Sequence, residues 1–527
     1  MKEWNEHTAG STTNASGSTA TELIPVASVE SGGVGTALRK LAGASAVYGL
    51  GSVLARGLAF VLLPVYTRYL TPAEYGIVSL TVTCTVVLGM LYPLGLRGAV
   101  SRTYYESGTV EERKDRVGTL WIAMLLFAAV SALVLDRIGS SLAAAVLPEV
   151  PFHPYLRLAV WTAFLGVLGL TPLVLLQARE RALPYVFLTL STALTTTAVT
   201  VWLVVRGGGA QGYLQGALIG AALAAIPYLA LTIGQIRPVF RMSILMPALA
   251  FSLPLVPHAL AGWALEMSDR AILTRFLPLH DVGVYSLGYQ LGAAMGLVTM
   301  AFNAAWVPFL FGTLKNESEE AHPKLARLVT YYAVVLCFIG LGWSLLVEHA
   351  ITLIAGPEFR EAYRITPWVV GGYVFAGLYL IPTNLLVWRQ QTRVIPLVTL
   401  AAGAVNVGLN LWLVPRYGAI AAAWSTLAAY AVLLILTWRT AERLHPFPYE
   451  YRRLGLIAGL ALALFLAGQL LPFPGPALEV AGRALLWLAF PFALIALGNF
   501  DRAELAALTG LIRGRKHPPP KQAGTTH

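Results

Sequence analysis

The stretch FSLPLVPHALAGWALEMSDRAILTRFLPLHDVGVYSLGYQ, residues 251–290, holds the pattern around which the chain is organised. An apolar helix leaves through Thr-Arg-Phe-Leu at 274–277 and is followed by a second apolar helix from about residue 283. The pattern occurs once before, at Thr-Arg-Tyr-Leu 67–70, at an offset of 207 residues (275 − 68) without a gap. The copies share Thr67/Thr274, Arg68/Arg275, Leu70/Leu277, Gly76/Gly283, Ser79/Ser286 and Leu80/Leu287. This density of identities indicates two related halves.

Composition sets the class of protein. The chain has 527 residues, of which 57% are hydrophobic and only 12% charged, whereas a soluble domain has roughly 25% charged residues. Many apolar runs reach the roughly 20 residues that a helix needs to cross a bilayer. The sequence therefore predicts an all-α polytopic membrane protein. The net charge of +11 does not indicate a nucleic-acid partner, because the basic residues lie in short loops between apolar runs.

We expect about fourteen membrane spans in two lobes. The predicted starts lie near residues 44, 77, 117, 157, 185, 212, 246, 283, 328, 365, 395, 418, 454 and 479. The predicted divisions are a disordered polar tail (1–36), an N-lobe of spans one to six (37–240), a C-lobe of spans seven to twelve (241–440), spans thirteen and fourteen (441–500) and a basic cytoplasmic tail (501–527). No secretory signal peptide is expected ahead of the first span.

The positions of Lys and Arg predict the orientation. If the N-terminus is cytoplasmic, 25 of the 37 Lys and Arg residues fall in inside segments and 8 in outside segments. The positive-inside rule then places both termini in the cytoplasm. A repeat of six spans is even, so the two lobes should be parallel, related by an axis along the membrane normal and facing each other across a central cavity.

Arg56 is the first candidate site residue. It lies about 12 residues into the first predicted span, or roughly 18 Å along a helix, and no acidic residue lies within four positions of it. A charge at that depth costs at least ~2.5–3.5 kcal/mol. We interpret Arg56 as an anion site in the central cavity; the alternative is a buried pair with an acid on another helix. Arg483, near the outer end of the last span, is expected to snorkel.

Span seven carries a second group of candidates. Glu266 and Arg270 are four residues apart in the favoured order for a helical ion pair, and Asp269 lies one turn from Glu266. A functional patch and a local structural pair remain equally open for these three residues. Pro254 and Pro257 allow the span to kink. Asn406 and Asn410 share one face of span eleven and are also candidates for the cavity lining, although hydrogen bonding between helices is the favoured role.

Several chemistries have no support in the sequence. It contains no phosphate loop, zinc-ligand spacing or nucleotide fingerprint, and Cys84 and Cys337 lie in apolar runs. We therefore expect no cofactor, no metal site and no ATP-driven transport by this chain alone. The two larger outside loops, 138–156 and 346–364, lack a nucleophile with a nearby base, so we do not expect an enzyme.

Five stretches resemble one family. They are LTPAEYGIVSL (70–80), PLGLRGAVSRTYYE (92–105), SDRAILTRFLPLHDVGVYSLGYQLG (268–292), GPEFREAYRITPWVVGGYVFAGLYL (356–380) and NVGLNLWLVPRYGAIAAAWSTLAAY (406–430). Together, in this order, they resemble the Wzx-type polysaccharide flippases of the multidrug/oligosaccharidyl-lipid/polysaccharide exporter superfamily. The resemblance implies twelve to fourteen helices in two lobes around a central cavity. It also implies ion- or potential-driven export of lipid-linked oligosaccharides by alternating access.

The expected function is thus a flippase of the plasma membrane for undecaprenyl-pyrophosphate-linked oligosaccharides in surface polysaccharide assembly. Expected partners are the lipid-linked substrate, membrane lipids, a coupling ion (proton or sodium), glycosyltransferases and a polymerase. One alternative is a drug or cation antiporter of the same fold, whose cavity should be acidic. Another is a membrane-embedded glycan polymerase, which would need paired catalytic residues in a large outer loop.

Overall fold

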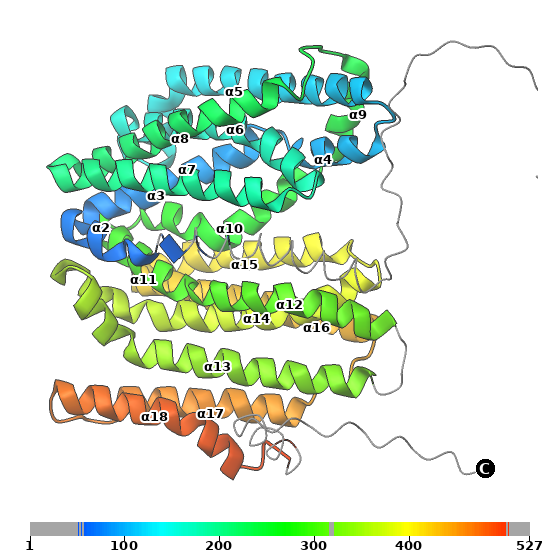
Figure 1. Cartoon of the computed structure of the whole chain (residues 1–527). Helices are drawn as coiled ribbons and strands as arrows, with labels where there is room; N and C mark the ends of the chain where they lie inside the picture. Colours follow the sequence, from blue (N-terminus) through cyan, green and yellow to red (C-terminus); the bar gives the residue numbers. More distant parts are fainter. Residues whose placement is uncertain are drawn as a thin grey trace, which may run out of the picture.

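The computed structural model describes residues 60–315 and 321–501, together with residues 51, 54, 57, 58 and 504. These residues form helices and no strand. The helices of the predicted N-lobe are α2 (Leu63–Tyr69), α3 (Pro72–Leu91), α4 (Arg97–Glu106), α5 (Val110–Val146), η1 (Phe152–Leu156), α6 (Arg157–Ala178), α7 (Ala182–Leu203), η2 (Val204–Gly208) and α8 (Gly209–Ile233). Figure 1 shows the helices side by side, with α5, α6 and α8 toward one edge and α17 and α18 at the opposite edge.

The second half follows a similar order. Its helices are α9 (Met242–Ser252), α10 (Leu255–Leu273), α11 (Leu279–Ala293), α12 (Met295–Lys315), α13 (Ala321–Ile354), η3 (Pro357–Arg364), α14 (Thr366–Trp388), α15 (Val394–Tyr417) and α16 (Ala419–Leu444). The last two helices, α17 (Tyr451–Leu470) and α18 (Pro476–Ala496), pack against α13. They therefore extend the second lobe at its outer flank (Figure 1).

The helix count agrees with a polytopic membrane protein. Eleven helices of the described residues are long and apolar enough to cross a bilayer, or twelve if α9 and α10 are one bent span. One of the eleven, residues 182–233, folds back on itself, because Gly216 lies against Thr200 and Gly220 against Thr196. The first predicted span falls mostly outside the described residues, so the count of fourteen stays a prediction.

Each described helix that matches a predicted span begins within seven residues of the predicted start. The largest differences arise where polar residues extend a helix beyond its apolar run. In α5, Thr109 caps the helix by accepting from the backbone N–H of Glu112 at 3.1 Å, and the charged turn that follows precedes the apolar residues. A threonine cap of this kind stabilises a helix start by about 1 kcal/mol. The helix therefore starts in polar residues, ahead of the apolar run that is long enough to cross the membrane.

Span seven is broken, as its prolines predict. The α9 and α10 helices are bent by 41° with Pro254 at the start of α10. The α9 half packs on α4 and α5 of the first lobe, whereas α10 packs on α15 and α16 of the second lobe and on α3. The turn before α4 contacts the break, because Gly95 has a φ of +70° and a Cβ there would overlap the backbone carbonyl of Ser252.

Candidate functional site

The two lobes meet through the residues of the sequence repeat. The N-terminal turns of α3 and α11 cross so closely that a Cβ on Gly76 would overlap the carbonyl oxygen of Leu279, and one on Gly283 would overlap that of Pro72. Pro72 and Leu279 are themselves 207 residues apart, so the contact is reciprocal. Two equivalent glycines thus allow the backbones of the two lobes to touch.

The repeated Thr-Arg motifs lie at the same end, which we call the motif end, and each contacts the opposite lobe. The Thr67 hydroxyl donates to the backbone carbonyl of Leu63 at 2.8 Å and lies 3.4 Å from that of Ile354. Arg275 donates to the carbonyl of Ala145 at 3.1 Å. Thr67 and Thr274 are both buried. The motif end of this structure is therefore closed by contacts from both copies of the motif.

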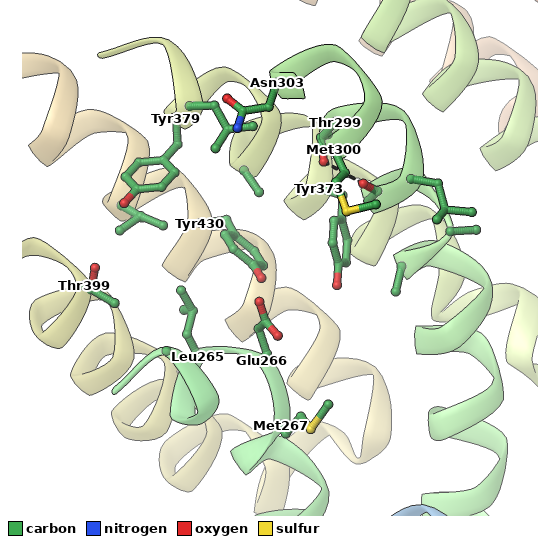
Figure 2. Close-up of a pocket in the computed structure, with 18 of the residues that line it drawn as sticks. Leu265, Glu266, Met267, Thr299, Met300, Asn303, Tyr373, Tyr379, Thr399 and Tyr430 are labelled. Atoms are coloured by element: carbon green, nitrogen blue, oxygen red, sulfur yellow. Dashed lines mark hydrogen bonds between the residues drawn. The ribbon is translucent and has the colours of Figure 1, made fainter. Parts of the chain in front are cut away.

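A cavity of about 850 Å³ lies among the helices of the bundle, and its lining residue Gln290 bonds to Tyr75 across the lobe boundary. Its walls come mainly from the second lobe: α10, α11, α12, α14, α15 and α16, with Phe60 from the first lobe. Its polar lining consists of Glu266, Gln290, Thr299, Asn303, Thr399 and the three tyrosines Tyr373, Tyr379 and Tyr430. Figure 2 shows the Glu266 carboxylate near the hydroxyl end of Tyr430, with the hydroxyl of Tyr373 on the same side. Among the described residues, the lining contains no Lys, Arg or His.

The α10 helix lines the cavity along its middle part and enters the core nearer its C-terminal end. Ala259, Gly262 and Glu266 are spaced by three and four residues and line the cavity. Asp269 and Arg270 are 2% and 7% exposed and face the interior. The sequence offered Glu266 as one possible partner of Arg270; the structure gives Arg270 an ion pair with the adjacent Asp269, at 2.8 Å. Helical spacing did not predict this contact, because adjacent residues of a helix do not face each other. The long arginine side chain reaches Asp269 by folding back along the helix.

The Asp269–Arg270 pair is the centre of a buried network. Asp269 also accepts from the backbone N–H of Arg270 at 2.8 Å and from the hydroxyl of Tyr285. Arg270 donates to the backbone carbonyl of Glu266 at 3.0 Å, and its guanidinium lies 4.2 Å from the ring centroid of Tyr289. Each charge therefore has several partners, as a buried ion pair requires. Arg270 does not line the cavity.

Asn406 and Asn410 belong to the same buried region. They share a face of α15, as predicted, because Asn410 donates to the backbone carbonyl of Asn406 at 2.9 Å. Asn406 is joined to Ser268 of α10 at 3.4 Å and to Thr426 of α16 at 3.5 Å. These contacts between helices fit the expected structural role. Neither asparagine lines the cavity, and both are at most 1% exposed.

The sequence analysis also singled out two arginines within predicted spans, Arg56 and Arg483. Arg56 lies outside the described residues; Phe60, four positions later in the sequence, lines the cavity. Arg483 does not snorkel: it is 8% exposed and pairs with Glu348 of α13 and Glu479 of α18, both at 2.7 Å. Its acidic partners satisfy the charge inside the bundle, so Arg483 fastens α18 to α13.

The sequence reasoning missed the residues that connect the cavity to the closure. The Tyr75 hydroxyl of α3 donates to the Oε1 atom of Gln290 in α11 at 2.6 Å, across the lobe boundary. Gln290 also lines the cavity. A glutamine within an apolar span is a polar group that must find a partner or a cavity. That signal was present in the sequence, whereas nothing in it identified Tyr373, Tyr379 and Tyr430 as neighbours.

The overall arrangement is shared with transporters of known structure. The chain is similar to the lipid II flippase MurJ in an inward closed conformation, with a TM-score of 0.69 at 12% identity, covering 85% of this chain and 99% of that one. It is also similar to a multidrug resistance MATE family transporter of the MOP superfamily, inward-facing, with a TM-score of 0.56 at 12% identity, covering 76% and 95%. These similarities define a MurJ/MATE-like transporter fold.

Sequence comparison defines the family. A model of the polysaccharide biosynthesis protein family matches residues 42–313, more than half of the chain, and the chain belongs to this family. It is 21% identical over 431 residues to the probable low-salt glycan biosynthesis flippase Agl15 of Haloferax volcanii, covering 80% of this chain and 88% of that protein. It is 23% identical over 310 residues to the succinoglycan biosynthesis transport protein ExoT of Rhizobium meliloti, covering 59% and 61%.

Proposed function

We propose that this protein is a flippase that moves lipid-linked oligosaccharides across the plasma membrane for surface polysaccharide assembly. The cavity carries the proposal: it lies among membrane-spanning helices and offers a carboxylate, amides and hydroxyls beside a closed contact between the lobes. A polar cavity inside a bilayer is expensive unless it serves a substrate. The family and the names of its relatives supply the substrate class.

The proposed mechanism is alternating access between the two lobes. Opening the Gly76–Gly283 contact would expose the cavity at the motif end, which we place on the outer side with both termini in the cytoplasm. A proton or sodium gradient, or the membrane potential, would drive the cycle. Glycosyltransferases would supply an undecaprenyl-pyrophosphate-linked substrate, and a polymerase would consume it. The protein itself would transport the substrate without a covalent step.

Arg56 is proposed to bind the pyrophosphate. Residues four apart share one face of a helix, and Phe60 already lines the cavity. A guanidinium can hold two phosphate oxygens at once, which an ammonium cannot do. Arg56→Lys should therefore retain part of the activity, and Arg56→Gln should remove nearly all of it.

The test is surface polysaccharide in a strain that lacks the protein, complemented by each variant at equal membrane abundance. Arg206→Gln, which changes an exposed arginine of η2, is the matched control and should complement fully. Full complementation by Arg56→Gln would show that Arg56 has a structural role only.

Cation antiport is the second candidate, and Glu266 is the observation that favours it. The carboxylate faces the cavity among tyrosine rings, and both groups attract cations. Arg270 does not argue against this alternative, because it pairs with Asp269 and does not line the cavity. In proteoliposomes, we expect the purified protein to move undecaprenyl-pyrophosphate-linked oligosaccharide and not tetraphenylphosphonium. The reverse result would establish the antiporter.

A further inference from the structure

We propose that the second-lobe cavity binds the glycan of the transported lipid and not its pyrophosphate. This inference rests on the proposed flippase function and divides the substrate between two places. The sugars would occupy the space between α10, α12, α14 and α15, and the pyrophosphate would lie beyond it, toward the first lobe.

Charge argues against a pyrophosphate in this cavity. Its described lining carries one carboxylate, Glu266, and no basic side chain. Like charges in a space of low dielectric repel strongly, so a multiply charged anion would be unfavourable beside Glu266. A glycan of neutral sugars brings no such penalty.

Hydrogen-bond chemistry also favours sugars. A carboxylate can only accept hydrogen bonds, and a fully ionised pyrophosphate can also only accept, so neither satisfies the other. A sugar hydroxyl both donates and accepts. It can donate to Glu266 and accept from the amide groups of Gln290 and Asn303. The Oε1 atom of Gln290 accepts from Tyr75, and the Oδ1 atom of Asn303 accepts from Asn384 at 2.8 Å. Both bonds orient the amides as donors.

The tyrosines provide rigid apolar faces. Tyr373 packs against Tyr289 and Tyr430, with ring centroids 6.4 and 5.8 Å apart, and Tyr379 and Phe60 also line the space. The apolar face of a pyranose ring packs well on such rings, and groups already held in place bind with a smaller loss of entropy. The volume of about 850 Å³ lies within the roughly 300–1,000 Å³ of typical small-molecule sites.

The test compares two lipids in proteoliposomes that contain the full-length protein. One is undecaprenyl pyrophosphate carrying a single N-acetylglucosamine, and the other carries a neutral tetrasaccharide. Thr399→Val removes a hydroxyl with almost no change of shape, and Tyr379→Leu removes a ring. We expect each to slow flipping of the tetrasaccharide lipid about tenfold, equivalent to about 1.4 kcal/mol, and that of the single-sugar lipid less than twofold.

Leu397→Val, two residues from Thr399 on the same helix at a 67% exposed position, is the control and should leave both rates unchanged. Equal slowing of both lipids by Thr399→Val, or no slowing of either, would overturn the glycan assignment while leaving the flippase function intact. Failure of the wild-type protein to move either lipid would instead refute the flippase function, and the glycan assignment with it.

Discussion

The two lobes share a scaffold and differ in chemistry. At the offset of 207 residues, Asp269 and Arg270 of the second lobe correspond to Leu62 and Leu63 of the first. Asp269 and Arg270 form an ion pair inside the bundle, whereas Leu63 is a core residue that is 1% exposed. Similar helices therefore hold an apolar core in one lobe and a polar network in the other.

The two copies of the repeat contain positions that are identical and positions that differ, and both kinds make contacts between the lobes. Gly76 and Gly283 touch each other's lobes, and Thr67 and Thr274 are both buried at the motif end. Tyr75 and Gln290, which bond across the boundary, correspond to Val282 and Thr83. The identical glycines thus make the closest backbone contact between the lobes, and the diverged pair Tyr75 and Gln290 adds a hydrogen bond to that closure.

The largest effect is expected from a substitution that breaks the Asp269–Arg270 ion pair of the second lobe. Asp269→Leu leaves the Arg270 charge buried without its carboxylate, which should destabilise the protein by about 3–5 kcal/mol. The double variant Asp269→Leu/Arg270→Leu copies Leu62 and Leu63 of the first lobe and should recover most of that loss. Thermal unfolding of the purified protein measures both. A double variant as unstable as the single one would mean that the network needs its charges.

The next effect concerns the glycine contact. Gly283→Ala places a Cβ against the carbonyl of Pro72, and overpacking of this kind costs about 1–3 kcal/mol. The closed motif end should open, so that a cysteine introduced in place of Ala293, which lines the cavity, reacts faster with a thiol reagent. Gly89→Ala on α3 meets no atom within 4 Å and should change neither stability nor reactivity. An unchanged labelling rate in Gly283→Ala would contradict the closing role.

A smaller effect is expected from the bond between Tyr75 and Gln290. Tyr75→Phe removes one hydrogen bond across the lobes, worth about 0.5–1.5 kcal/mol. The closed state should become less populated, which raises the reactivity of a cysteine at the motif end by several-fold. Tyr69→Phe, at an exposed ring of the same motif, is the control. Equal rates in the two variants would show that the bond does not hold the lobes together.

The smallest effect is expected at the two arginines of the repeat, Arg68 and Arg275. Arg275 is exposed and donates to Ala145 of the other lobe. Exposed interactions of this kind contribute about 1 kcal/mol or less. Arg275→Ala should therefore lower the melting temperature by only a degree or two, and Arg68→Ala should behave alike if the lobes are equivalent here. A loss as large as that of Asp269→Leu would assign Arg275 a role beyond the motif end.

Much of the fold could be read from the chain. Apolar runs of bilayer length predicted the spans, the prolines predicted the break between α9 and α10, and the repeat predicted equivalent residues in two halves. The separate helix α4 was missed, because it depends on the turn at Leu94 and Gly95, where both residues have positive φ. Leu94 gives no local signal for such a turn, since bulky residues rarely adopt that conformation.

Sequence alone determined the class of protein, because length and apolarity decide whether a helix can lie in a bilayer. It also determined which residues recur, and so which glycines could allow two helices to touch. Only the tertiary structure decided the partners: Arg270 with Asp269, Arg483 with Glu348, and Tyr75 with Gln290. Spacing along one helix fixes which side chains share a face, whereas the groups that meet across helices depend on how the faces pack.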